Sequence, residues 1–427
     1  MKQSRIYIGG NIYGAGNIGD DAALAGILLI LELAAPGANI TIGTYNGKNP
    51  DNLSPALQYV NSYDMLKISS DVRHSDCFIS GGGTMIGDEI GLSFPLKYNA
   101  QLISIAKLYG KRTVMMAIGA NKLQHDNSMK IARTIFSLTD LVTVRDEESR
   151  RVCLELGSEP NRTAITADPA FLLDARETPR TKEIKERLRA RGRTFGINVV
   201  NESWADINEY KMGIARACNY LASKYGYLPV FFCNEVRPGK FYDFAANSQT
   251  AAMLRCEHEL MEPIYYSPEE MIDIISVFDF TISMRMHSLI FAAVAGTPFV
   301  AVSRVDKVDN FMRQFGLNVS GTVDNCDGEQ LITDIERLLE NREAYRNRVA
   351  ERVAILRQNC LKNIDLLSNL LDERRVLWNK VSVSSLQFAL GKNKLNKIFQ
   401  GLLNREITLS QIVHKLLGIF RRGVGNQ

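Results

Sequence analysis

The chain has 427 residues, of which 45% are hydrophobic and 23% charged, a composition typical of a soluble globular protein. This length favours two domains with extensions over a single core. The formal net charge is only +4, and no cluster of lysine and arginine is interleaved with aromatic residues, which argues against nucleic-acid binding. Seven scattered cysteines without CxxC spacing favour reduced thiols over a disulfide framework or a zinc site.

The first residues of the sequence and its apolar runs indicate where in the cell the protein is expected. Residues 1–5 lead directly into an apolar strand, so we expect no secretory signal. The sequence contains no run of about 18 uncharged apolar residues, so we expect no membrane-spanning helix. These features predict a cytoplasmic protein.

The first half of the chain alternates short apolar strands, glycine turns and helices. We expect strands at residues 5–9, 39–44, 76–80, 113–118, 141–144 and 163–166. Helices are expected at residues 20–34, 101–109 and 147–156. This alternation predicts a parallel sheet covered by helices on both faces.

The pattern restarts in the second half, with strands expected at residues 194–200, 228–233, 278–282 and 299–302. The sequence thus predicts an α/β fold of two Rossmann-like domains facing a cleft, as in the glycosyltransferase-B type. We expect domains at 1–175 and 194–380, joined by a densely charged surface helix and linker at 176–193. Residues 381–427 are basic and have apolar residues at helical spacing, so they predict an amphipathic helical tail. Such a helix could pack on the protein or a partner, or contact a membrane surface.

The segment 283–298 places Arg285 and His287 between a buried strand and an apolar helix closed by Gly296. Ligands in open α/β sheets bind beyond the carboxyl ends of strands, where these two residues are expected. Arginine binds carboxylates or phosphates, and histidine exchanges protons near neutral pH. The segment therefore indicates a site for an anionic substrate that needs proton transfer. Alternatively, Arg285 forms a structural ion pair and His287 caps the helix.

Two glycine-rich segments could approach a ligand closely. Residues 14–19 match G-x-G-x-x-G, but the carboxylates that follow would repel a pyrophosphate at the helix N-terminus. Asp20 instead orients a sugar hydroxyl or acts as a base, or it merely caps the helix. Residues 81–83 are predicted to form a second loop, and Asn17, Gly82 and Gly83 are candidates for contact with a sugar.

Further strand ends carry charged residues. Arg145 follows the strand at 141–144, Asp146 is expected to cap the next helix, and Lys307 follows the strand at 299–302. With Arg285 and His287 these cations suit a small dianion or trianion. Asp168 is expected mainly to form a turn, with sugar contact as the second possibility. The other histidines lack metal-ligand spacing, so we expect no metal, and no P-loop or serine-hydrolase motif occurs.

Five motifs occur in order along the chain. They are Gly-Asn-Ile-Gly-Asp-Asp-Ala-Ala-Leu (16–24), Ile-Ser-Gly-Gly-Gly-Thr (79–84), Val-Thr-Val-Arg-Asp-Glu-Glu-Ser (142–149), Ala-Asp-Pro-Ala-Phe (167–171) and Met-Arg-Met-His-Ser-Leu-Ile-Phe-Ala (284–292). Together they give roughly residues 5–320 a resemblance to the polysaccharide pyruvyl transferase family.

The resemblance implies a glycosyltransferase-B-like fold and transfer of the pyruvyl group of phosphoenolpyruvate (PEP) onto two hydroxyls of a hexose. The hexose would belong to a polysaccharide or a lipid-linked glycan precursor, the product would be a cyclic ketal, and phosphate would be released. PEP would be a co-substrate, with no separate cofactor. By motif position, Arg145 would bind PEP, His287 would be the essential histidine, Lys307 the downstream lysine and Asp20 the acidic residue.

The chain departs from the family pattern at two places. Ser-Arg-Val-Asp-Lys (303–307) stands where the family often has Tyr-Asp-Pro-Lys, and residues 234–239 replace a more acidic loop. These departures leave the acceptor sugar open. A glycosyltransferase using a nucleotide sugar is the alternative function on the same fold, and a non-catalytic partner protein is a third class.

Overall fold

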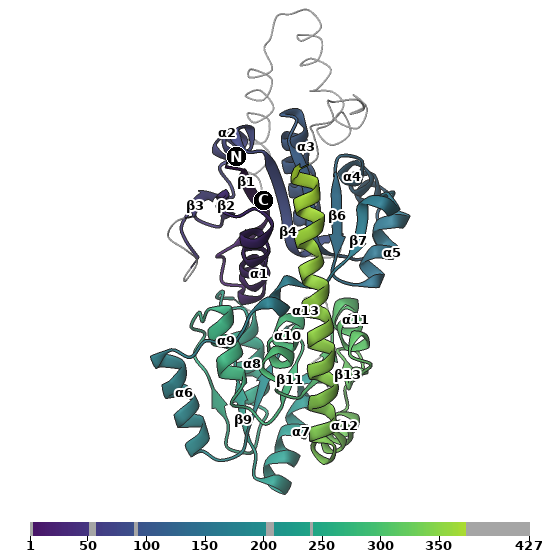
Figure 1. Cartoon of the computed structure of the whole chain (residues 1–427). Helices are drawn as coiled ribbons and strands as arrows, with labels where there is room; N and C mark the ends of the chain where they lie inside the picture. Colours follow the sequence, from purple (N-terminus) through teal and green to yellow (C-terminus); the bar gives the residue numbers. More distant parts are fainter. Residues whose placement is uncertain (1–2, 51–56, 89–92, 202–208, 240–241, 373–427) are drawn as a thin grey trace, which may run out of the picture. The chain divides into compact units, whose positions relative to one another are not determined.

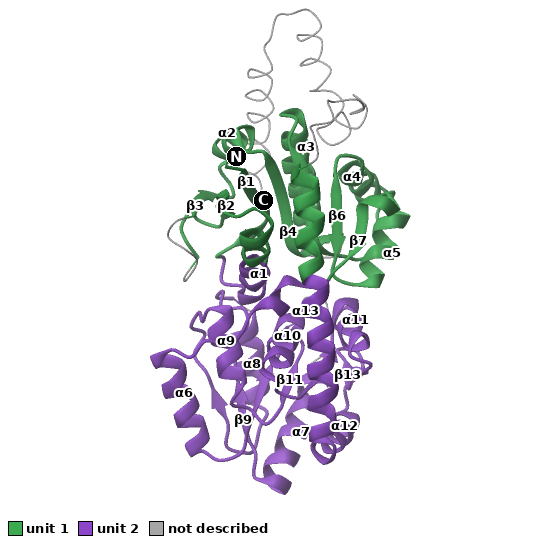
Figure 2. Cartoon of the chain, in the orientation of Figure 1, with its two compact units in different colours: residues 1–14, 27–166, 361–427 green, residues 15–26, 167–360 purple. Residues whose placement is uncertain are grey.

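A computed structural model describes residues 3–50, 57–88, 93–201, 209–239 and 242–372 (Figure 1). The chain forms two compact units, and neither is continuous in sequence (Figure 2). Unit 1 comprises residues 1–14, 27–166 and 361–427, and unit 2 comprises residues 15–26 and 167–360. The predicted tail at 381–427 lies outside the described residues.

Unit 1 is built on a parallel sheet in the order β3-β2-β1-β4-β5-β6-β7. Its strands are β1 (Arg5–Tyr13), β2 (Asn39–Thr44), β3 (Gln58–Asn61), β4 (Cys77–Ile86), β5 (Arg112–Ala120), β6 (Leu141–Val144) and β7 (Thr163–Ile165). Its helices are α2 (Met65–His74), α3 (Ser93–Leu108), α4 (Asp126–Ser137) and α5 (Glu147–Glu155). The near-continuous apolar runs of β4 and β5 are buried, as expected for central strands of a parallel sheet.

Unit 2 repeats this plan in a parallel sheet of order β10-β9-β8-β11-β12-β13. Its strands are β8 (Thr194–Asn198), β9 (Leu228–Phe231), β10 (Glu259–Leu260), β11 (Thr281–Ser283), β12 (Phe299–Ser303) and β13 (Gly321–Thr322). Its helices are α6 (Pro179–Ala190), α7 (Glu209–Tyr225), α8 (Asp243–Ala251), α9 (Pro268–Ile275), α10 (Met286–Ala295), α11 (Asp306–Gln314) and α12 (Glu329–Glu340). The strand order reverses between β8 and β11, the position at which open α/β sheets bind ligands.

Two helices contribute residues to both units, namely α1 (Ile18–Ala34) and α13 (Arg342–Asp372). The first turns of α1 belong to unit 2 because Ile18 and Ala22 are buried in the same apolar cluster as Phe171 and Leu289. The two parallel α/β sheets confirm the predicted fold class. The division differs from the continuous segments expected at 1–175 and 194–380, because side-chain burial unites residues that are distant in sequence.

Two local predictions need correction. The charged stretch 176–193 is not a free linker, since its helix α6 lies within unit 2 and packs on α9. Residues 81–83 do not form a loop after a strand but lie within β4, where Gly81 and Gly83 are in register with Met116 and Ile118 of β5. Gly82 and Gly83 have φ of 68° and 93°, a left-handed conformation that β4 accommodates because glycine has no Cβ.

Glu270 of α9 forms an ion pair with Arg180 of α6, and we expect this pair to make the protein less stable in acid. Burial alone would raise the pKa of Glu270, but hydrogen bonds from Arg180, Ser267 and Thr178 lower it to about 2. A carboxyl whose folded pKa is depressed stabilises the protein above its unfolded pKa, and this stability is lost as the pH falls from about 4.5 towards about 2. Because Arg180 is 44% exposed and screened by water, we expect a loss of about 1 kcal/mol.

Urea unfolding at about pH 5 and about pH 3 measures this loss, and Glu270→Gln is the control because its amide does not titrate. The free energy of unfolding of Glu270→Gln should fall less between the two pH values than that of the wild type. An equal fall in both proteins would show that Glu270 makes no contribution to the acid sensitivity.

Candidate active site

His287 lies in the first turn of α10 and faces a buried carboxylate. Its Nε2 is 3.6 Å from Oδ2 of Asp168, and the two side chains are 13% and 3% exposed. The other oxygen of Asp168 accepts a hydrogen bond from the backbone N–H of Ala170 at 3.2 Å. An imidazole can act as a general acid or base, and Asp168 is placed to orient the ring of His287 for such a role. The alternative that His287 caps its helix is not supported, because the cap residue of α10 is Arg285.

The other side of the His287 ring lies against the start of α1. A Cβ added at Gly19 would be only 2.2 Å from Nδ1 of His287, so the ring occupies the space that any other residue would fill. Asn17 begins this helix by accepting a hydrogen bond from the N–H of Gly19 through its Oδ1 at 3.1 Å. Asp20 follows in the first turn, half-buried. The capping contact at the start of α1 is therefore made by Asn17.

We predict that Gly19→Ala displaces the His287 ring and lowers turnover. A Cβ contact of 2.2 Å must be relieved by movement of the imidazole or of α1. A misplacement of about 1 Å in an active site can cost about 10²-fold in rate. The measurement is kcat, followed by the melting temperature of the variant.

Gly213→Ala is the matched control, because a Cβ there would lie 2.0 Å from the carbonyl oxygen of Cys326, and neither residue is near His287 in sequence or contact. We expect Gly213→Ala to lower the melting temperature and to leave the kcat of the folded fraction near the wild-type value. An equal loss of kcat in both variants would contradict a specific link between Gly19 and His287.

Arg285, which was predicted to bind an anionic substrate, is held by two carboxylates. Its Nε and Nη2 donate to Oδ1 of Asp243 at 2.9 and 2.6 Å, and its Nη2 is 2.8 Å from Oε2 of Glu235. Burial opposes the guanidinium charge, yet these carboxylates hold the pKa of Arg285 above its usual value. The structure thus supports the structural ion pair considered as the alternative. Neither carboxylate is close to Arg285 in sequence, so the partners could not be predicted.

Arg145, at the end of β6 in unit 1, is almost fully buried. Its side chain is 4% exposed, with Nη2 3.3 Å from the hydroxyl of Thr84 and Nε 3.6 Å from Asp146. Asp146 also accepts a hydrogen bond from the N–H of Ser149 at 2.7 Å, which confirms its predicted role as the cap of α5. A Cβ at Gly119 would lie 2.5 Å from Nη2 of Arg145, so this glycine makes room for the guanidinium.

Thr84 and Gly119 also belong to the environment of Arg145 and were not among the predicted site residues. Both lie near the ends of adjacent strands, where Thr84 of β4 is in register with Gly119 of β5. The Gly-Gly-Gly-Thr motif contained the signal, but only strand pairing shows that its threonine faces Arg145. Gly82, predicted to contact a sugar, instead accepts a hydrogen bond from Asn11 through its carbonyl at 3.3 Å.

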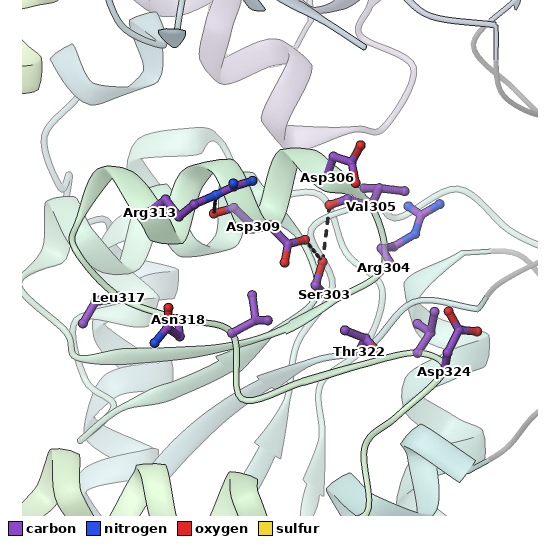
Figure 3. Close-up of a pocket in the computed structure, with 12 residues that line it drawn as sticks. Ser303, Arg304, Val305, Asp306, Asp309, Arg313, Leu317, Asn318, Thr322 and Asp324 are labelled. Atoms are coloured by element: carbon purple, nitrogen blue, oxygen red, sulfur yellow. Dashed lines mark hydrogen bonds between the residues drawn. The ribbon is translucent and has the colours of Figure 1, made fainter. Parts of the chain in front are cut away.

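Lys307 is the second residue of α11, directly after the loop that follows β12. A cavity of about 550 Å³ opens beside this loop in unit 2 (Figure 3). Its charged lining comprises Arg304, Asp306, Asp309, Arg313 and Asp324. Three carboxylates against two guanidiniums make this cavity a poor site for a trianion.

Two features are absent from the described residues, a cluster of metal ligands and a membrane-spanning helix. Within residues 3–372, outside the gaps given above, no three His, Cys, Asp or Glu side chains are grouped as metal ligands would be. In the same part of the chain, every helix is too short or too polar to cross a bilayer.

The protein-family model described as polysaccharide pyruvyl transferase matches residues 17–306 of the chain. The chain belongs to the polysaccharide pyruvyl transferase family. The match includes Asn17, Asp20, Arg145, Asp168 and His287, and ends one residue before Lys307. The amylovoran biosynthesis protein AmsJ of Erwinia amylovora is 21% identical over an alignment of 338 residues, and the alignment covers 75% of each chain. The family is that of a transferase in polysaccharide biosynthesis, as the ordered motifs predicted.

Solved structures share the fold at low sequence identity. The UDP-GlcNAc 2-epimerase of Neisseria meningitidis is 12% identical, with a TM-score of 0.58 over 86% of this chain and 99% of that one. HepE of Anabaena, solved with UDP-glucose, is 12% identical, with a TM-score of 0.53 over 86% and 99%. The UDP-GlcNAc 2-epimerase of Methanocaldococcus jannaschii is 13% identical, with a TM-score of 0.56 over 84% and 98%. These similarities establish the fold alone.

Proposed function

We propose that this pyruvyl transferase moves the pyruvyl group of PEP onto two hydroxyls of one hexose, forming a cyclic ketal and releasing phosphate. The observation that carries the proposal is the contact of His287 with Asp168 in a chain of this family. PEP is an enol phosphate, and its C3 must accept a proton before C2 becomes electrophilic. A histidine beside a carboxylate is suited to this step.

The reaction balances with the groups that the chain provides. A C3–H bond forms with a proton from His287, and the oxygen of the first hydroxyl bonds to C2 while its proton passes to Asp20. The bond between C2 and the phosphate oxygen then breaks. The second hydroxyl bonds to C2, and its proton leaves with the phosphate. The proton held by Asp20 then returns through solvent to His287, which restores both residues. The products are one ketal and one inorganic phosphate, and PEP brings both the pyruvyl group and the leaving group, so no cofactor is needed.

The proposal assigns the anionic groups of PEP to Arg145 and Lys307. Arg145 offers a planar fork of donors in a buried setting, where charge-assisted hydrogen bonds are strong. Arg285 receives a supporting role, since Asp243 and Glu235 already share its charge. Asn17, Gly82, Gly83 and Asp168, which the sequence suggested for sugar contact, are engaged in helix capping, strand geometry or the His287 pair. We therefore propose only Asp20 as a direct partner of the sugar hydroxyls.

The proposed acceptor is a polysaccharide or a lipid-linked glycan precursor, and the proposed location is the cytoplasm, where PEP is made. Support comes from AmsJ, which is named for amylovoran biosynthesis. Contact of the basic segment 381–427 with the inner face of the membrane is part of this proposal. Pelleting of the full chain with anionic liposomes, compared with a chain cut at residue 381, tests that part.

Mass spectrometry of products tests the function. The enzyme is incubated with PEP and a panel of free and lipid-linked hexosides, and released phosphate is measured in parallel. We expect one acceptor to gain the mass of one pyruvic acid less one water, with one phosphate released for each ketal.

Transfer from a nucleotide sugar is the alternative, favoured by the fold shared with HepE, which was solved with UDP-glucose. The same acceptors are therefore incubated with UDP-glucose in place of PEP. A mass gain of one hexose with UDP-glucose, and none with PEP, would replace the proposed function by this alternative.

A further inference from the structure

Asp243, the first residue of α8, is fully buried and accepts five hydrogen bonds. Its Oδ2 accepts from Nδ2 of Asn198 at 2.8 Å and from the backbone N–H groups of Asn234 and Glu235 at 2.8 and 3.0 Å. Its Oδ1 accepts from Nε and Nη2 of Arg285. Both oxygens of this carboxylate are occupied by these hydrogen bonds. Asp243 can therefore affect the reaction only through the residues that it binds.

The charges around Asp243 are balanced. Asp243 and Glu235 carry two negative charges, and Arg285 and Arg237, which also contacts Glu235, carry two positive charges. Buried charges are costly unless they are paired and hydrogen-bonded. Removal of one of these four charged side chains would therefore leave a buried charge without its partner. Loss of Asp243 would also remove the hydrogen bonds that hold the backbone at residues 234 and 235.

That segment holds the loop in front of α1. Asn17 and Glu235 form an isolated antiparallel bridge, in which the N–H of Ile18 donates to the carbonyl of Asn234 at 3.0 Å. The N–H of Val236 donates in turn to the carbonyl of Gly16 at 2.9 Å. Two backbone hydrogen bonds thus join residues 16–18 to residues 234–236, and neither involves a side chain.

The first turn of α1 contacts His287 and carries Asp20, the two residues proposed for proton transfer. Gly19 packs against the His287 ring, and Asp20 follows it. A continuous series of contacts, all within unit 2, therefore runs from Asp243 through residues 234–236 to residues 16–20.

We propose that Asp243 is a positioning residue for this reaction: through Arg285 and residues 234–236 it sets where the first turn of α1 meets His287. Its catalytic consequence rests on the proposed function, whereas its effect on the glycine loop does not. Asp243 touches no reacting atom. It acts by fixing the distance between the proton donor His287 and the acidic residue Asp20.

The first test measures backbone amide exchange in Asp243→Asn, by mass spectrometry of peptides that cover residues 15–26. The asparagine keeps the size of the side chain and removes its charge. Hydrogen bonds to a charged carboxylate are stronger than those to a neutral amide, so we expect exchange in the peptides covering residues 15–26 to accelerate about tenfold or more. The matched control is Asp273→Asn, because Asp273 is also a buried aspartate of unit 2 and binds Thr181 and Lys185 on α6.

We expect Asp273→Asn to accelerate exchange in α6 and α9 and to leave residues 15–26 as in the wild type. Equal exchange at residues 15–26 in Asp243→Asn and the wild type would overturn the proposal, as would a uniform increase throughout unit 2. If Asp243→Asn does not fold, Glu235→Gln is measured in its place, since it removes one carboxylate of the same cluster and keeps Asp243.

The second test is kinetic. We expect Asp243→Asn to lower kcat about tenfold and to change KM for PEP less than about twofold, because it leaves Arg145 and Lys307 intact. In the double variant Asp243→Asn/Asp20→Asn, the fold-loss of kcat should be smaller than the product of the two single losses, because both substitutions affect the first turn of α1. Fully multiplicative losses would overturn the kinetic part.

The two tests separate this proposal from the proposed function. If the wild type forms no ketal, the function fails, but the exchange experiment still decides whether Asp243 positions the glycine loop. If the ketal forms and the exchange is unchanged, the function stands and the positioning role fails.

Discussion

His287→Ala is expected to reduce kcat for ketal formation by about 10²–10⁴-fold, the usual contribution of a general acid or base. The substitution removes the imidazole whose Nε2 lies 3.6 Å from Oδ2 of Asp168. PEP should still bind, because Arg145 and Lys307 remain. The measurement is kcat and KM for PEP with the acceptor identified by mass spectrometry.

His258→Ala is the control for this prediction. His258 is also a partly buried histidine of unit 2, and its Nδ1 contacts the carbonyl of Cys256 rather than a carboxylate. We expect near wild-type kcat from His258→Ala. Near-normal turnover of His287→Ala at saturating PEP would show that the proton comes from another group.

Arg145→Ala is expected to raise KM for PEP about 10–100-fold. A hydrogen bond between charged groups contributes about 1.5–3 kcal/mol, and burial of Arg145 keeps water from replacing it. Arg145→Lys keeps the charge but loses the planar fork, so its KM should lie between those of the wild type and Arg145→Ala. Steady-state kinetics with varied PEP measures both.

Arg151→Ala is the matched control for Arg145. Arg151 lies on the neighbouring α5, is 52% exposed and pairs with Glu148 and Glu155 on the same helix. Its removal should leave KM for PEP unchanged. If Arg145→Ala folds and its KM also equals that of the wild type, Arg145 has only a structural role with Thr84 and Asp146.

Local patterns were sufficient for much of the fold. The apolar runs of β2 and β6 have the bounds that the sequence predicted, and Gly296 ends α10 with φ of 69° as expected of a C-cap glycine. These features depend on neighbours in the chain, namely side-chain periodicity and the conformational freedom of glycine. The predicted loop at residues 81–83 was wrong because pairing with β5 extends β4 through glycines that would end an isolated strand.

The ordered motifs also identified the residues near the proposed chemistry. His287, Asp20 and Arg145 each follow a strand or a glycine turn, positions at which α/β folds bind ligands. What these residues contact could not be predicted in the same way. The partner of His287 is 119 positions away, at Asp168, and a turn was the first interpretation of that residue.

The sequence by itself determined the two parallel α/β sheets, the family and the main candidate residues, because these depend on short periodicities and on motifs that lie within single loops. Only the tertiary structure decided that Arg285 is neutralised by Asp243 and Glu235, and that Gly19 and Gly119 make room for His287 and Arg145. The physical reason is that ion pairing and close packing act between atoms within a few ångströms, whatever their separation along the chain.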